Sequence, residues 1–178
     1  MALVVFLRGV NVGGHRTFQP SLLAKKLAKH NVINVGAAGT FVVMKPINQA
    51  ELRHELLRSL PLEADIMFCS GGDLIELVSS DPFAGEPSGS DVVRFVSVLA
   101  KRPRVLPALP LSLPAPDNWL LKIIEVRGRF ALGLYRRMMR AITLLSQIER
   151  RFGVSTTTRN WNTILTIAET LKNKRVDR

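Results

Sequence analysis

Two polar segments, one near each end of the chain, combine residue types that suit anion binding. The first covers residues 8–14, reads RGVNVGG, and follows an apolar run at residues 2–7. Its paired glycines can expose backbone N–H groups to an anion, and Arg8 adds positive charge. The segment matches neither the P-loop nor the G-x-G-x-x-G pattern. A tight structural loop that needs positive φ angles is the alternative interpretation.

The second segment covers residues 156–163, reads TTTRNWNT, and separates a predicted strand from a predicted helix. Thr158 or Asn160 could cap that helix, whose free N–H groups favour an anion. Arg159 could hold a carboxylate or phosphate with two parallel hydrogen bonds. Capping and turn formation alone would explain the same residues, with Trp161 as a core anchor.

These segments define a hypothetical small-anion site between two lobes. Its expected ligand-binding residues are Arg8, Asn11, Gly13, Gly14, Arg159, Asn160 and Asn162. Arg supplies charge and a planar fork of donors, while Asn supplies both a donor and an acceptor. In the competing interpretation, these side chains bond to one another and fasten the lobes together.

Catalytic and metal-binding patterns are thin. His15, His30 and His54 have no metal-ligand spacing with one another or with Cys69, and no nucleophile motif is present. We expect no metal and no cofactor, and we can name no catalytic residue. Whether the protein is an enzyme is therefore left open by the sequence. Cys69 lies in an apolar run and is expected to be buried. A single cysteine cannot form a disulfide within the chain, which suits a cytoplasmic location.

The charge is distributed unevenly along the chain. Residues 1–90 carry 8 Lys/Arg and 8 Asp/Glu, whereas residues 91–178 carry 17 and 6, so the second half holds the whole net charge of +11. A basic half indicates nucleic acid or another polyanion as partner, although a merely soluble basic surface is the alternative. No apolar run reaches the roughly 18–20 residues of a membrane span, so no membrane partner is expected. The predicted nucleic-acid-binding residues are Arg94, Lys101, Arg102, Arg104, Arg136, Arg137 and Arg140.

The first half predicts the order β-α-β-β-α-β, which is the ferredoxin-like arrangement. Strands are expected at residues 2–7, 32–35, 40–44 and 64–69, and helices at 20–30 and after a cap at Asn48. If an RNA-binding sheet of this type were present, Phe41 and Phe130 would offer stacking surfaces, although core positions suit both better. A short helix at 73–79 follows.

The second half repeats this pattern less cleanly after a small, polar linker at residues 85–90. A strand at 92–99 precedes residues 103–116, whose five prolines allow only a poor or broken helix. A hairpin at 119–126 and 130–135, an amphipathic helix ended by Gly153, a short strand at 154–157 and a closing helix follow. We predict an α+β fold with two tandem ferredoxin-like lobes, residues 1–84 and 91–178, the second degenerate, and a C-terminal helix.

The motifs LRGVNVGG at residues 7–14 and TTRNWNT at residues 157–163 resemble the two signatures of the bacterial family called domain of unknown function 1697. The resemblance spans nearly the whole chain and implies tandem ferredoxin-like lobes, with no established activity or cofactor. Two departures stand out. Residues 37–40 read AAGT where the family has Gln-Ser-Gly-Asn, and residues 136–139 read RRMM where it has Gly, Ser and Lys. If those polar groups line a site, the site here is partly lost or altered.

Two functions follow as hypotheses. The first is a binding module for nucleic acid or another polyanion, located in the basic second half. The second is a site for a phosphorylated or carboxylated small molecule, with or without catalysis, between the two signature segments. Oligomeric state, substrate and pathway are not encoded in any recognisable pattern.

Overall fold

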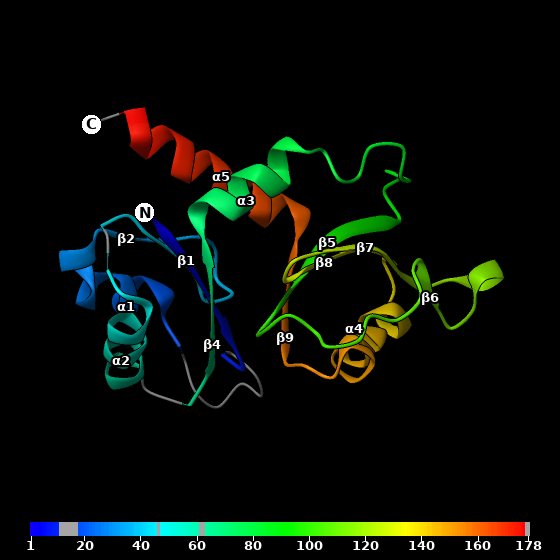
Figure 1. The fold of residues 1–178 in the computed structure, drawn as a ribbon, viewed down its shortest axis with the longest axis horizontal. Helices are drawn as coiled ribbons and strands as arrows, with labels where there is room; N and C mark the ends of the chain where they lie inside the picture. The colour runs from blue at the N-terminus through cyan, green and yellow to red at the C-terminus, as the bar shows by residue number, and fades with distance from the viewer. Residues whose placement is uncertain (11–17, 46, 61–62, 177–178) are drawn as a thin grey trace. The chain divides into compact units, whose positions relative to one another are not determined.

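The computed structural model describes residues 1–10, 18–45, 47–60 and 63–176, with side chains up to residue 173, and the chain forms two compact units (Figure 1). Unit 1 comprises Met1–Ser80 and Leu165–Arg178, and unit 2 comprises Asp81–Ile164. These units differ from the predicted lobes in two places. Residues 81–90, including the predicted linker, belong to unit 2, and the closing helix continues from unit 2 into unit 1.

Unit 1 is built on a four-stranded antiparallel sheet. Its strands are β1 (Leu3–Arg8), β2 (Val32–Asn34), β3 (Thr40–Val43) and β4 (Asp65–Ser70). They lie in the order β2-β3-β1-β4, with β1 paired to both β3 and β4. This strand order and the predicted sequence of elements together define a ferredoxin-like unit.

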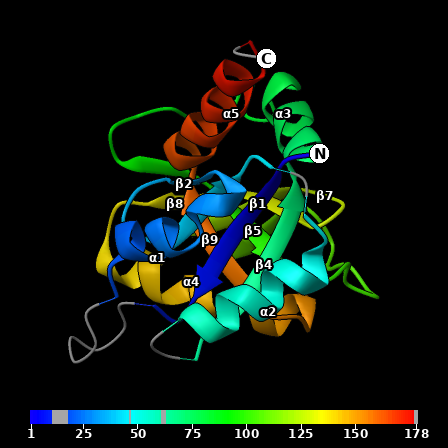
Figure 2. The same cartoon turned by 90° about the vertical axis from the view of Figure 1, so that its left-hand side faces the viewer.

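Two helical segments cover one face of this sheet (Figure 2). The first consists of α1 (Pro20–Lys26) and a 3-10 turn, Ala28–His30, and the second is α2 (Gln49–Ser59). Leucines at positions 23, 27, 52 and 56 pack on the alternate strand residues Val5 and Leu7. The predicted cap of α2 is confirmed, because Asn48 Oδ1 accepts a 2.8 Å hydrogen bond from the N–H of Ala50.

Helices α3 (Gly71–Ser79) and α5 (Trp161–Val176) lie side by side (Figures 1 and 2). Ser70 caps α3 by accepting from the N–H of Asp73 at 3.0 Å. A glycine begins α3 where the helices touch, since a Cβ at Gly71 would lie 2.8 Å from Leu171 Cδ2. Helix α3 lies wholly in unit 1, and α5 belongs to unit 1 from Leu165 onward.

Unit 2 has a five-stranded antiparallel sheet in the order β6-β7-β8-β5-β9. The strands are β5 (Val92–Leu99), β6 (Leu111–Leu113), β7 (Leu121–Arg127), β8 (Phe130–Arg136) and β9 (Thr156–Asn160). Without β6, the order matches that of unit 1, so the second lobe is also ferredoxin-like. The departure is the first helix, which is replaced by an irregular segment and the edge strand β6.

The prolines explain that replacement. Each proline lacks the N–H that a helix interior needs, and five occur within residues 103–116. No helix forms between β5 and β6, and Leu111–Leu113, which contains no proline, pairs with β7. A short 3-10 turn, Pro116–Asn118, then leads to the hairpin.

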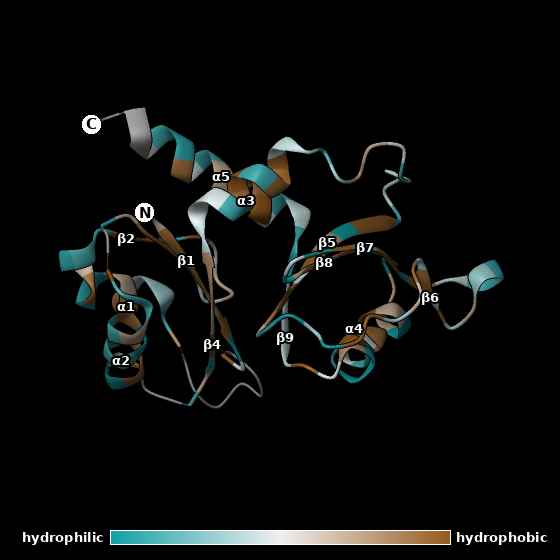
Figure 3. Cartoon of the chain, in the orientation of Figure 1, coloured by the Kyte–Doolittle hydropathy of each residue, from teal (hydrophilic) through white to brown (hydrophobic). Residues whose placement is uncertain are grey.

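One helix, α4 (Met139–Phe152), packs on a face of the second sheet. Its predicted apolar positions are confirmed: Ala141, Ile148 and Phe152 are buried, and two leucines between them are half-buried. Gly153 ends the helix with a φ of 63°, where glycine is favoured. In Figure 3 the strands of both units are largely hydrophobic, as two separate cores require.

Candidate functional site

Arg8 ends β1 and interacts within unit 1. Its Nη1 donates a 2.9 Å hydrogen bond to Asp65 Oδ2, on the residue directly opposite in β4. Both side chains are substantially exposed, so the pair contributes little to stability. The other predicted residues of this segment, Asn11, Gly13 and Gly14, lie outside the described residues.

Arg159 lies in β9 of unit 2 and is buried, with 7% of its surface exposed. Its Nη1 donates to Thr157 Oγ1 at 2.8 Å and to the Thr158 carbonyl at 2.9 Å. Burial lowers its pKa to about 10, so the guanidinium remains charged at neutral pH. The geometry therefore shows Arg159 bonded along its own strand.

The asparagines that follow lie at the surface. Asn160 and Asn162 are exposed, and Asn160 Oδ1 accepts a 2.7 Å hydrogen bond from the hydroxyl of Thr163. The predicted anion site that includes these residues stays a prediction.

Three of the seven predicted nucleic-acid-binding residues make contacts within unit 2. Arg94 donates to the Glu86 carbonyl at 3.0 Å, and its guanidinium lies 5.7 Å from the ring centre of Phe83. These contacts hold residues 83–86 against β5. The ring of Phe83 in turn packs edge-on against that of Trp161, with ring centres 5.0 Å apart. Trp161 is therefore an anchor in the core, as the sequence predicts.

Arg136 and Arg137 hold the segment that precedes β5. Arg136 pairs with Asp91 at 2.6 Å and stacks over Trp119 at 4.2 Å, while Arg137 Nε donates to the Ser90 carbonyl at 3.1 Å. The remaining four predicted residues are exposed cations: Lys101, Arg102, Arg104 and Arg140.

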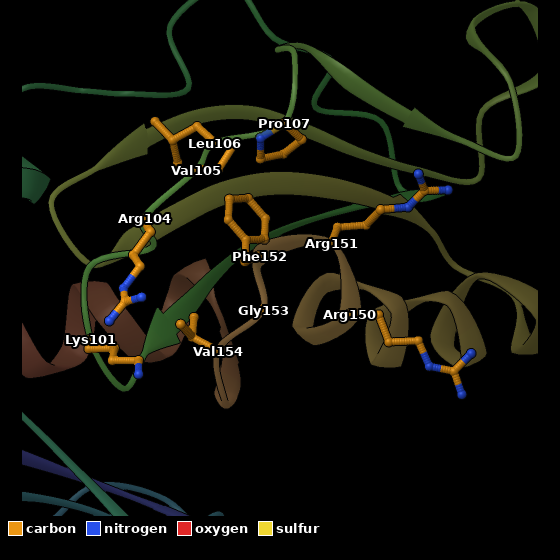
Figure 4. A pocket seen from close by; sticks show the side chains of 10 residues that line it. All are labelled: Lys101, Arg104, Val105, Leu106, Pro107, Arg150, Arg151, Phe152, Gly153 and Val154. Carbon is orange, nitrogen blue, oxygen red and sulfur yellow. The ribbon is translucent and has the colours of Figure 1, made fainter.

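A basic pocket of about 580 Å³ opens in unit 2 beside two of these cations (Figure 4). Its cationic lining residues are Lys101, Arg104, Arg150 and Arg151. Its apolar lining residues are Val105, Leu106, Pro107, Phe152 and Val154. None of the described residues that line this basic pocket is Asp or Glu, so its charge is uniformly positive.

The strand register explains why the two halves of the basic pocket meet. β5 and β9 are antiparallel neighbours, with Leu99 opposite Thr156, so the end of one lies beside the start of the other. The segment after β5 supplies Lys101 and Arg104. The last turn of α4, which ends just before the turn into β9, supplies Arg150 and Arg151. Sequence reasoning missed these two arginines, although the strand order of a ferredoxin-like lobe could have placed them there.

The sheets do not present a stacking platform of the RNA-binding type at the predicted phenylalanines. Phe41 and Phe130 are 1% and 6% exposed, which is the core position that suits them better. Cys69 is buried as expected. Among the described residues, no three His, Cys, Asp or Glu side chains gather as metal ligands would. No helix within the described part of the chain is long and apolar enough to cross a membrane.

The family described as "Protein of unknown function (DUF1697)" matches residues 1–112. The chain belongs to this family. A solved structure, that of the conserved bacterial protein SP0830 from Streptococcus pneumoniae, is similar over 96% of this chain and 98% of that one, with a TM-score of 0.59 and 14% identity. At that identity the likeness concerns the fold alone. No curated protein matches the sequence. Membership and likeness thus support the α+β architecture and leave the activity to be argued from the residues.

Proposed function

We propose that unit 2 binds polyanions and that the basic pocket is their main contact. The observation that carries this proposal is the meeting of four exposed cations, with no acidic residue among the described lining. A concave surface with one sign of charge concentrates its field and attracts ligands of opposite charge. The excess of Lys and Arg over Asp and Glu in residues 91–178 acts in the same direction.

The distribution of the cations favours an extended ligand over a compact one. In Figure 4, Lys101 and Arg104 lie at one side of the basic pocket, whereas Arg150 and Arg151 extend at the other. Exposed ion pairs each contribute only about 0–1 kcal/mol. Useful affinity therefore needs several contacts at once, together with the counterions that a polyanion releases on binding.

A structural role for two of these residues is the competing explanation. Arg150 and Arg151 occupy the last turn of α4, where positive charge interacts favourably with the helix dipole. That role does not involve Lys101 and Arg104, which follow β5. The two explanations therefore separate when stability and binding are measured on the same variants.

The experiment compares the intact chain with the double variant Arg150→Ala/Arg151→Ala, using inorganic polyphosphate and an oligonucleotide as ligands. Binding is measured from about 50 mM to about 200 mM salt, where phosphate contacts weaken steeply. We expect the variant to bind both ligands more weakly, with a salt slope reduced by about 0.7–0.9 for each lost phosphate contact. Urea unfolding of both proteins measures the helix-dipole contribution separately.

Arg58→Ala is the matched control, because Arg58 is the exposed basic residue in the last turn of α2. It loses a charge at an equivalent helix position but lies in unit 1. Its binding should equal that of the unmodified chain. No binding of either ligand at about 50 mM salt would refute the proposed function.

A further inference from the structure

The basic pocket has an apolar middle between its charged sides. Figure 4 shows Val105, Leu106, Pro107 and Phe152 between the Lys101–Arg104 side and the arginines of α4. Val105 and Leu106 are 78% and 50% exposed, so their side chains are available to a ligand. Phe152 is only 4% exposed and supports this surface from the core.

An apolar middle restricts the chemistry of the ligand. A phosphate placed on it would lose water without gaining hydrogen bonds, which is unfavourable. The ligand portion that lies there must itself be largely apolar or flat, with anionic groups to either side. Inorganic polyphosphate has no such portion, whereas nucleic acid alternates phosphates with planar bases.

The hollow shape restricts the ligand further. A duplex keeps its bases stacked inside and presents phosphates outward, whereas a single strand can splay a base away from its neighbours. The basic pocket, at about 580 Å³, lies in the size range of sites that enclose small organic groups. Proteins that bind single strands without sequence preference combine a basic groove with aromatic side chains on which bases stack. Here the groove is basic in the same way, but its exposed contact surface is aliphatic, formed by Val105, Leu106 and Pro107.

Building on the proposed function, we infer that the ligand is single-stranded nucleic acid and that the apolar middle of the basic pocket receives one unstacked base. Lys101 and Arg104 bind the backbone on one side of that base, and Arg150 and Arg151 bind it on the other. Val105, Leu106 and Pro107 form the contact surface of the base.

The test uses three DNA ligands of equal length on the full chain: a single strand, the same strand made abasic, and a duplex. We expect the single strand to bind about twofold or more tighter than the abasic strand, which is less than the roughly fivefold or more that stacking on an aromatic side chain provides. The duplex should also bind more weakly than the single strand. An oligoribonucleotide of the same sequence distinguishes RNA from DNA as the ligand.

The double variant Val105→Ser/Leu106→Ser assigns the effect to the basic pocket. Both side chains are exposed, so the substitutions leave the core intact. We expect the variant to bind the single strand no more tightly than it binds the abasic strand. Its affinity for the abasic strand should equal that of the unmodified chain. Leu22→Ser is the matched control, since Leu22 on α1 of unit 1 is also 50% exposed.

Equal affinity for the base-containing, abasic and duplex ligands would overturn this inference and leave polyanion binding intact. A single-strand preference that persists in Val105→Ser/Leu106→Ser would also overturn it, because the base would then bind elsewhere. Absence of binding to all three ligands and to inorganic polyphosphate would overturn the proposed function itself.

Discussion

The backbone N–H of Ala100 donates a 2.9 Å hydrogen bond to the carbonyl of Ser155. The Ala100 carbonyl accepts in turn from Arg129 Nη1 at 3.1 Å. These bonds fix the chain immediately after β5 beside the turn that joins α4 to β9. Since Lys101 is the next residue, the Ala100–Ser155 bond sets where one side of the basic pocket begins.

Replacing Ala100 with proline tests this relationship. Proline has no N–H, so the bond to Ser155 is lost, whereas the extended conformation that proline imposes on Leu99 already exists in β5. We expect the free energy of unfolding to fall by about 1 kcal/mol. Polyanion affinity should also fall, because Lys101 and Arg104 are less firmly placed. Ala100→Ser keeps the N–H and serves as control in urea unfolding and binding. Equal binding by the proline variant would show that the bond does not position the cations.

The order of elements was predictable because local patterns specify it. The five apolar positions of α4 recur at helical spacing, Gly153 ends that helix, and Asn48 caps α2 as its residue type suggests. The prolines at 103–116 indicated a poor or broken helix, and no helix forms between β5 and β6. The pairing of β6 with β7 was not predictable, because three residues carry too little pattern and the pairing depends on tertiary register.

The candidate site was only half predictable, because charge counts do not distinguish paired side chains from exposed ones. Lys101 and Arg104 emerged from the basic excess, and they line the basic pocket. Arg94 and Arg136 emerged in the same way, yet Arg94 bonds to the backbone carbonyl of Glu86 and Arg136 pairs with the carboxylate of Asp91. Those contacts bring together residues that the linear sequence does not pair.

Gly133→Ala tests the packing of the second sheet. A Cβ at Gly133 would lie 2.5 Å from the carbonyl oxygen of Lys122 in β7 and 2.5 Å from Phe95 Cζ in the core. The neighbouring backbone cannot yield without disturbing the sheet, so we expect a loss of about 2–3 kcal/mol in urea unfolding.

Gly72→Ala is the control for that substitution. Gly72 lies in α3, and the nearest atom to its Cβ is Ser70 Oγ at 3.6 Å, which is ordinary contact. Alanine there should stabilise the helix by about 0.5–1 kcal/mol. Similar stability changes in both variants would contradict the close approach of Lys122 and Phe95 to Gly133.

Glu55 gives unit 1 a defined pH dependence. Lys29 Nζ and His30 Nε2 lie 2.7 Å and 2.9 Å from its carboxylate oxygens, and these hydrogen bonds lower the pKa of Glu55 from its ordinary value. An acid whose pKa is lower in the folded state stabilises the fold above its unfolded pKa. That contribution is lost as the pH falls through the folded pKa. Glu55→Gln should therefore lower the urea midpoint at pH 7, and the difference from the unmodified chain should shrink below about pH 4.3. A difference that is constant with pH would contradict an ionised Glu55 as its source.

Arg159 allows the structural and ligand-binding interpretations to be separated. The buried guanidinium donates to Thr157 Oγ1 and the Thr158 carbonyl, so Arg159→Ala removes both bonds and leaves a void. We expect the free energy of unfolding to fall by about 1–3 kcal/mol. Arg159→Lys retains the charge but lacks the planar fork, so it should recover only part of that loss. The measurement is urea unfolding of each variant, with and without added orthophosphate. Arg58→Ala, which removes an exposed arginine, should leave the unfolding free energy within about 0.5 kcal/mol of the unmodified value. If Arg159→Ala unfolded normally but no longer responded to orthophosphate, the hydrogen bonds would not be its main role, and the predicted anion site would gain support.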